Sequence, residues 1–306
     1  MNHIVTALLI VAMASCLFTN TANANSNLAE KAKSAILNEN LDDASDAIEQ
    51  AIEESPTQAD LYKLAGDIYA SRAQSASIFS APGLAKKSLK SYKQAVKLAP
   101  DNTRYRKSLM QYYLMAPGIV GGDKKLGADQ VKAIETLDSI QGTIAKTLLY
   151  LSKEDADALK RLYSELPKEQ SNHPEIKLAK ANYLAQTDQV DDALIILTEL
   201  ANTDPAQFVT EDTKLIPYKA MLQSGFIGLR DDAHAIQGAE SFKRYLANAP
   251  DTYRLVTKNW AIYFLGLSYA SLGENELANE AYNKARQNTN SKALIKEIKS
   301  AQKKVK

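Results

Sequence analysis

The chain has 306 residues, of which 45% are apolar and 24% charged, and a net charge of +1. These values are typical of a soluble protein with one or two domains or a single repeat array. The near-neutral charge, and the absence of aromatic residues interleaved with basic ones, argue against nucleic-acid binding.

The first 24 residues are predicted to be a secretory signal peptide. Residues 4–18 form an apolar run, and small residues follow up to a cleavage point after Ala24. Because no lysine or arginine precedes the run, an uncleaved anchor is one alternative. Lipidation of Cys16 is another, although Met13 fits poorly where lipoprotein signals usually have leucine. We expect export across the inner membrane to the periplasm, with membrane contact only if this segment is uncleaved or lipidated.

Cys16 is the only cysteine, so cleavage leaves a chain without thiols. That excludes disulfides, thiolate zinc sites and a cysteine nucleophile from the mature protein. His173 and His234 are 61 residues apart and are each predicted to be surface residues. We expect no metal and no other cofactor.

Two amphipathic helices separated by Gly273 are predicted near the C-terminus. The first has Leu265, Gly266 and Tyr269 on one face. Neither short helix could bury its apolar face alone, so neighbouring hairpins must stack. The second helix has a small residue, then apolar residues four and seven positions later, and this pattern recurs along the chain. Where the repeats are clearest, a proline follows at position twelve: Ala44/Ile48/Ala51/Pro56, Ser88/Tyr92/Ala95/Pro100, Ala193/Leu197/Leu200/Pro205 and Gly238/Phe242/Tyr245/Pro250, with Ala278/Tyr282/Ala285 in the C-terminal hairpin.

These residues resemble the tetratricopeptide repeat family. The resemblance implies an all-α, right-handed α-solenoid of helix–turn–helix hairpins, with six or seven hairpins over residues 25–290. The repeats are degenerate near residues 105–170, and residues 291–306 are predicted to form a capping helix. It also implies a non-catalytic scaffold that binds another protein or a peptide. The alternatives are a membrane-tethered structural component of an envelope complex, or an enzyme with its site near residues 81–87 and 116–125.

Residues 116–125, "APGIVGGDKK", have the composition of a phosphate-binding loop but lack the GxxxxGK[ST] spacing and a preceding strand. A similar "APGLAKK" begins 35 residues earlier, at residue 81. We therefore interpret both as turns inserted between the two helices of successive repeats. Together they form a candidate binding edge: Pro82, Gly83, Pro117, Gly118, Gly121, Gly122 and Lys124.

Asp-Asp-Ala triplets begin at residues 42, 191 and 231, and the first two fit helix N-termini better than metal sites. The third is out of register, which indicates a longer helix or an insertion. Charge is uneven, with −6 over residues 28–54 and +7 over residues 84–107. Solvated helix faces explain this, and a basic patch that attracts an acidic partner is the alternative.

Five further residues are candidates for partner binding on the first helices. The resemblance places Lys63 and Lys107 where some family members bind a ligand carboxylate, but Asp67 and Gln111 stand where those members have other clamp residues. Recognition of a carboxylate is therefore not predicted. Aromatic ligand anchors near the concave face are one interpretation of the last two candidates, and packing is the other. The five are Lys63, Lys107, Gln111, Trp260 and Tyr263.

Overall fold

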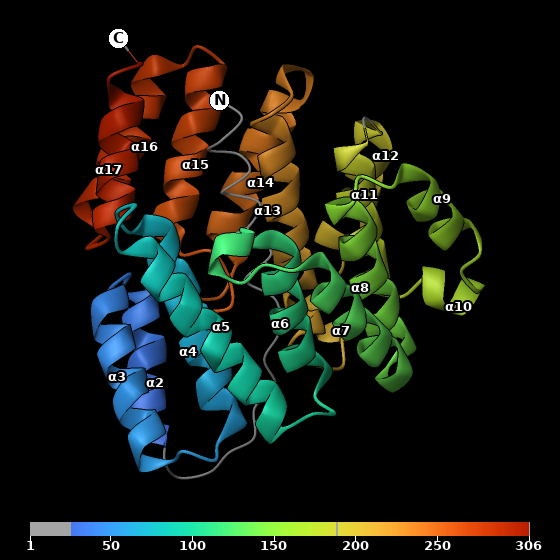
Figure 1. Ribbon diagram of the computed structural model, residues 1–306. Helices are drawn as coiled ribbons and strands as arrows, with labels where there is room; N and C mark the ends of the chain where they lie inside the picture. The colour runs from blue at the N-terminus through green and yellow to red at the C-terminus, as the bar shows by residue number, and fades with distance from the viewer. Residues whose placement is uncertain (1–25, 188, 306) are drawn as a thin grey trace. The chain divides into compact units, whose positions relative to one another are not determined.

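The computed structural model describes residues 26–187 and 189–305, and Figure 1 shows that their regular elements are helices. No β-strand occurs in these two ranges. No helix within them is both long enough and apolar enough to cross a membrane. The predicted signal segment, including Cys16, lies outside the described residues.

Most α-helices follow one another with short connections, and the longest connection, residues 202–215, contains two 3-10 helices. The α-helices are α2 (Ser26–Leu37), α3 (Leu41–Glu54), α4 (Ala59–Ser75), α5 (Ala81–Leu98), α6 (Thr103–Met115), α7 (Lys124–Leu137), α8 (Ser139–Ser152), α9 (Ala156–Ser164), α10 (Lys168–Ser171), α11 (Pro174–Gln186), α12 (Val190–Ala201), α13 (Ile216–Gly228), α14 (Ala235–Asn248), α15 (Lys258–Ser271), α16 (Asn275–Gln287) and α17 (Lys292–Gln302). Short 3-10 helices are η1 (Gly118–Val120), η2 (Pro205–Gln207), η3 (Thr213–Leu215) and η4 (Asp232–His234).

The chain divides into two compact units. The N-terminal unit comprises residues 26–35 and 41–183, and the C-terminal unit comprises residues 36–40 and 184–305. In the N-terminal unit, α4 packs on α5, α6 on α7 and α8 on α9, and each pair contacts the next. In the C-terminal unit, consecutive helices from α12 to α17 pack in the same way. The predicted all-α fold of stacked helical hairpins is confirmed.

A glycine on the first helix lets an aromatic ring of the second helix come close. A β-carbon on Gly66 would lie 2.4 Å from the ring of Tyr92, and one on Gly266 would lie 2.6 Å from the ring of Tyr282. Both aromatic residues occupy the position four residues after the small residue in the predicted second-helix pattern. Since almost any side chain at these glycines would push the helices apart, the pattern records the close packing of each hairpin.

The degenerate middle of the chain keeps the same packing without the proline signal. On α7, Gly127, Val131 and Ile134 are buried at the same spacing of four and seven residues. Val131 and Ile134 pack in one core with Met110 of α6. The position twelve residues after Gly127 is Ser139, and the missing proline explains why this register could not be fixed from the sequence.

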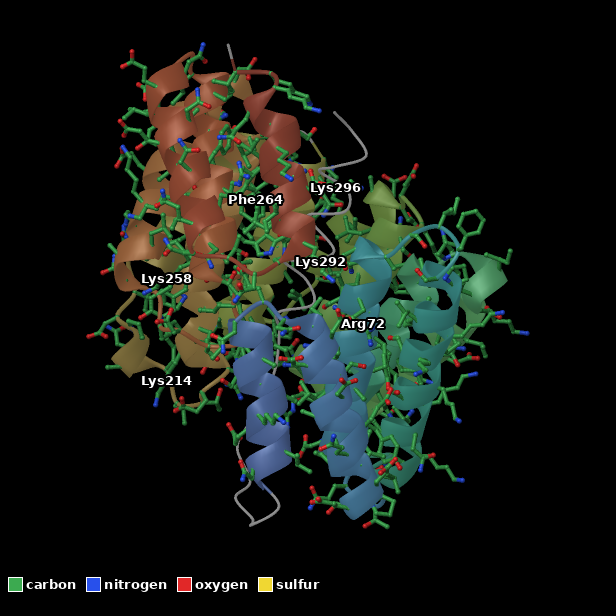
Figure 2. All side chains as sticks on the ribbon, turned by 90° about the vertical axis from the view of Figure 1, so that its left-hand side faces the viewer. Arg72, Lys214, Lys258, Phe264, Lys292 and Lys296 are labelled. Carbon is green, nitrogen blue, oxygen red and sulfur yellow. The ribbon has the colours of Figure 1, made fainter. Side chains whose placement is uncertain are left out.

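The last helix, α17, buries one face. Leu294, Ile298 and Ala301 are its buried residues, as their spacing predicted. Ser291 caps the helix by accepting a hydrogen bond from the backbone N–H of Leu294. Its lysines are on the exposed side, and Figure 2 labels Lys292 and Lys296 among them.

Candidate functional site

A row of polar side chains connects three successive first helices of the N-terminal unit. Lys107 of α6, Gln141 of α8 and Glu175 of α11 are each 34 residues apart. Lys107 Nζ donates to Gln141 Oε1 at 2.7 Å, and Gln141 Nε2 donates to Glu175 Oε2 at 2.9 Å. A donor on one side and an acceptor on the other fix which way the amide points. The row therefore sets how these first helices pair.

Lys63 occupies the corresponding position of α4 and is only 2% exposed. Its Nζ lies 2.5 Å from Oδ2 of Asp67, whose Oδ1 accepts a hydrogen bond of 2.9 Å from the Tyr92 hydroxyl. Burial raises the pKa of Asp67, and the charge of Lys63 opposes that shift. Burial, with the charge of Asp67, also raises the pKa of Tyr92 well above 10, so this residue donates as a neutral phenol.

Three of the five candidate partner-binding residues thus lie on α4 and α6, in different settings. Lys63 and Lys107 are buried and hold polar partners inside the unit, whereas Gln111 is half-buried on α6. Sequence reasoning did not find Gln141 or Glu175. The signal for both was the 34-residue spacing of long polar side chains from Lys107.

The other two candidates, Trp260 and Tyr263, belong to an aromatic cluster of the C-terminal unit. Tyr263 is buried, and its ring centroid lies 5.9 Å from that of Tyr282 on α16. Trp260 is half-buried and packs 5.8 Å from both Tyr263 and Phe264. Phe264, labelled in Figure 2, continues the cluster, and its ring centroid lies 5.0 Å from that of Phe226 on α13. These aromatic residues hold successive hairpins together.

The first predicted loop of the candidate edge is helical, which corrects the prediction of an inserted turn there. Pro82 and Gly83 form the first turn of α5, and the connection from α4 is residues 76–80. Proline fits this place because its missing N–H would have no helical partner and its φ is already near helical. The order Ala-Pro-Gly therefore starts a helix here instead of redirecting the chain.

The second loop is a turn, as predicted. Pro117 precedes η1, and Gly121 then adopts φ 99°, the left-handed region. The N–H groups of Val120 and Gly122 both donate to the carbonyl oxygen of Pro117, and that of Gly121 donates to Gly118. Because these amides are used within the loop, they do not form a phosphate cradle. Lys124, the first residue of α7, donates from Nζ to the carbonyl oxygen of Ser152 at 2.5 Å.

The aspartates of the three triplets lie at helix beginnings. Asp42 and Asp43 are in the first turn of α3, and Asp191 and Asp192 are in the first turn of α12. In the third triplet, Asp231 caps η4, a short 3-10 turn inserted before α14. No three His, Cys, Asp or Glu side chains in residues 26–187 and 189–305 are grouped as a metal site.

His234 and His173 differ in their surroundings. His234 was predicted to be a simple surface residue, but its ring lies between Asp231 and Asp191 with its side chain 21% exposed. In the sequence, Asp231, three residues before His234, could have indicated that the histidine has a carboxylate partner. His173 is half-buried, and its Nδ1 is buried without a hydrogen-bond partner in the described structure.

Three exposed apolar side chains lie around the beginning of α5 in the N-terminal unit. Ile78 and Phe79 are 82% and 93% exposed just before α5 begins, and Ile119 is 84% exposed in η1. The Tyr112 hydroxyl lies 2.8 Å from the carbonyl oxygen of Ala85 on α5 and 2.9 Å from that of Val120 in η1. Its single proton is shared between the two oxygens, which holds the second loop against the beginning of α5. We call Ile78, Phe79 and Ile119 the apolar edge.

Repeated hairpins with this close packing define a tetratricopeptide-like helical repeat fold. Yeast Tom70 is similar over 98% of this chain and 72% of its own, with 13% identity and a TM-score of 0.53. A tetratricopeptide repeat protein from Parabacteroides merdae ATCC 43184 is similar over 92% of this chain and 98% of its own, with 14% identity and a TM-score of 0.46. No family model and no curated protein matches the sequence. At these identities the similarities concern the fold alone.

Proposed function

We propose that this protein is a non-catalytic scaffold that binds another protein or a peptide, in the periplasm or cell envelope. The observation that carries the proposal is the apolar edge. Monomeric soluble proteins rarely gather large apolar side chains on their surface, and such groups commonly mark interaction sites. The helical repeat fold supports the same conclusion, because stacked hairpins offer long surfaces for extended partners.

The export part of this proposal rests on residues 4–24. The apolar run followed by small residues has the order of a secretory signal. Mass spectrometry of the protein recovered from the envelope fraction tests it. We expect Asn25 as the first residue. Retention of Met1, or a lipid on Cys16, would instead place the protein at the membrane.

Crosslinking in the intact envelope, followed by purification of the full chain, tests the binding part. The edge variant carries Ile78→Ser, Phe79→Ser and Ile119→Ser, and we expect it to lose a protein that the unmodified chain retains. The control makes the same change at three exposed aliphatic residues of the C-terminal unit, Ile195, Val209 and Ile236. If no protein is retained by the unmodified chain, or both variants retain it equally, the apolar edge is not the docking site.

A further inference from the structure

One face of α5 carries a row of lysines. The opposite face is buried against α4: Ser88 Oγ donates to the Gly66 carbonyl oxygen at 2.8 Å, and the Tyr92 hydroxyl reaches Asp67. That anchoring fixes which way the helix faces. The remaining side presents four exposed lysines separated by four, three and four residues, which places them on one line: Lys86, Lys90, Lys93 and Lys97.

These four lysines have no carboxylate within ion-pair distance in the part of the chain that the structure describes. Their neighbour Lys87, by contrast, lies 3.2 Å from Glu49. Nζ of Lys93 lies over an aromatic ring, 5.9 Å from the centre of Tyr113. Eight basic residues and one acidic residue over positions 84–107 leave the region strongly positive. The ammonium groups of the four lysines therefore repel one another, and the row attracts anions.

A partly buried leucine lies beside the row of lysines. An open groove of about 350 Å³ is lined by the four lysines together with Leu89 and Gln94. It follows α5 from Lys86 to Lys97, a rise of roughly 16 Å at 1.5 Å per residue. The beginning of α5 adjoins the apolar edge, since a β-carbon on Gly121 of the second loop would lie 2.6 Å from Leu89. The row of lysines on α5 and the apolar edge are therefore neighbouring surfaces.

We propose that this groove binds an acidic amphipathic helix of a partner protein, a conclusion that rests on the proposed scaffold function and specifies its partner. A helix with carboxylates at i, i+4, i+7 and i+11 repeats the lysine spacing along the same rise. Apolar residues at one of its ends pack on Ile119 and Phe79. A straight row of charges with a leucine beside it matches one face of a single helix better than it matches a flat bilayer. This surface lies on a second helix, away from the polar row of the first helices.

A labelled synthetic peptide tests the proposal by fluorescence anisotropy with the full mature chain. The probe is a 16-residue alanine-based helix with glutamates at positions 3, 7, 10 and 14 and two leucines at one end. A scrambled peptide of the same composition controls for charge alone. We expect binding that weakens with salt, and a clear preference for the ordered peptide over the scrambled one.

Two charge variants carry the same total charge change. The groove variant replaces Lys86, Lys90, Lys93 and Lys97 with glutamate. The matched control replaces four exposed lysines with the same spacing, three on α17 and one directly after it: Lys292, Lys296, Lys299 and Lys303. We expect the groove variant to weaken peptide binding more than about tenfold and the control to change it by less than about twofold. Circular dichroism confirms that both variants fold.

The remaining outcomes decide against the proposal. An equal loss of peptide binding in both variants would mean that the peptide is attracted by the net charge of the protein and does not bind in the groove. Absence of peptide binding, while the crosslinked partner still depends on the apolar edge, would leave the scaffold intact but refute an acidic helix as its ligand. Vesicles of one part phosphatidylglycerol to three parts phosphatidylcholine form the last arm. Groove-dependent sedimentation with them, without competition from the peptide, would assign the surface to anionic lipid.

Discussion

Nε2 of His234 lies 3.0 Å from Oδ1 of Asp191, a residue 43 positions earlier in the chain. Nδ1 of the same ring lies 2.7 Å from Oδ2 of Asp231. Each ring nitrogen therefore faces a carboxylate, and only the doubly protonated imidazolium can donate to both. The histidine joins the beginning of α12 to the turn before α14, within the C-terminal unit.

This geometry predicts a stability that depends on pH. Hydrogen bonding to Asp231, followed by that to Asp191, raises the pKa of His234. The contribution of His234 is then complete below the ordinary histidine value of about 6.5, and it is lost as pH rises through the raised folded-state value. The pKa of Asp231 is lowered, chiefly by the hydrogen bond with His234. Its contribution is present above about 3.9 and is lost as pH falls through the lowered value.

Thermal melts between pH 4.5 and 9 measure the effect. We expect His234→Gln to cost about 0.2–1 kcal/mol near pH 5.5 and almost nothing at pH 9, because the groups are partly exposed. For Asp191→Asn we expect a smaller stability loss than for His234→Gln, because the hydrogen bond between His234 and Asp231 remains. Curves of the unmodified chain and His234→Gln that stay parallel over the whole range would contradict an imidazolium link.

The buried pair of Lys63 and Asp67 predicts a strongly non-additive double mutant. Asp67→Leu alone leaves the Lys63 ammonium buried beside an apolar side chain, and we expect a loss of about 3–5 kcal/mol. Adding Lys63→Met removes the buried ammonium that has lost this carboxylate and should recover at least half of that loss. Urea unfolding of the single and double variants gives the coupling. Additive costs would show that the two charges do not stabilise each other in the fold.

Local sequence patterns predicted most of the fold, because each hairpin needs a small residue and large apolar residues at the same spacing. Tyr92 and Tyr282 follow their small residues by four positions, and both meet a glycine of the first helix in the structure. On α7 the same faces are buried, but Ser139 stands where the other repeats have proline. The register there depends on packing with α6 and α8, which no local pattern records.

The candidate site was predicted less well, because its contacts join residues far apart in sequence. The hydrogen bond from Lys107 to Gln141 spans 34 residues, and that between His234 and Asp191 spans 43. Pro82 shows a different difficulty. The same tripeptide Ala-Pro-Gly begins a helix at residue 81 and a turn at residue 116, so the tripeptide alone does not decide between them.

Glycines of the two Ala-Pro-Gly segments are predicted to respond oppositely to alanine. A β-carbon on Gly122 would lie 1.7 Å from the carbonyl oxygen of Ala116, so the loop must rearrange. We expect Gly122→Ala to cost about 1–3 kcal/mol. A β-carbon on Gly83 meets nothing within 4 Å, and this residue is helical. Gly83→Ala should therefore stabilise the protein by about 0.4–1 kcal/mol. Chemical denaturation of both variants measures this, and a neutral Gly122→Ala would refute the tight loop.

The aromatic cluster predicts that Phe264 is the most sensitive position of α15. Its ring is fully buried, 5.0 Å from Phe226 and 5.8 Å from Trp260. Phe264→Ala leaves a cavity, and we expect a loss of about 3–5 kcal/mol, whereas Phe264→Leu should keep most of the packing. Trp260 is the only tryptophan in the sequence, so urea unfolding followed by its fluorescence reports on the C-terminal unit. The exposed residue Ile236 supplies the control, since Ile236→Ala should stay within about 0.5 kcal/mol. A loss below about 1 kcal/mol for Phe264→Ala would show that the cluster does not hold the hairpins together.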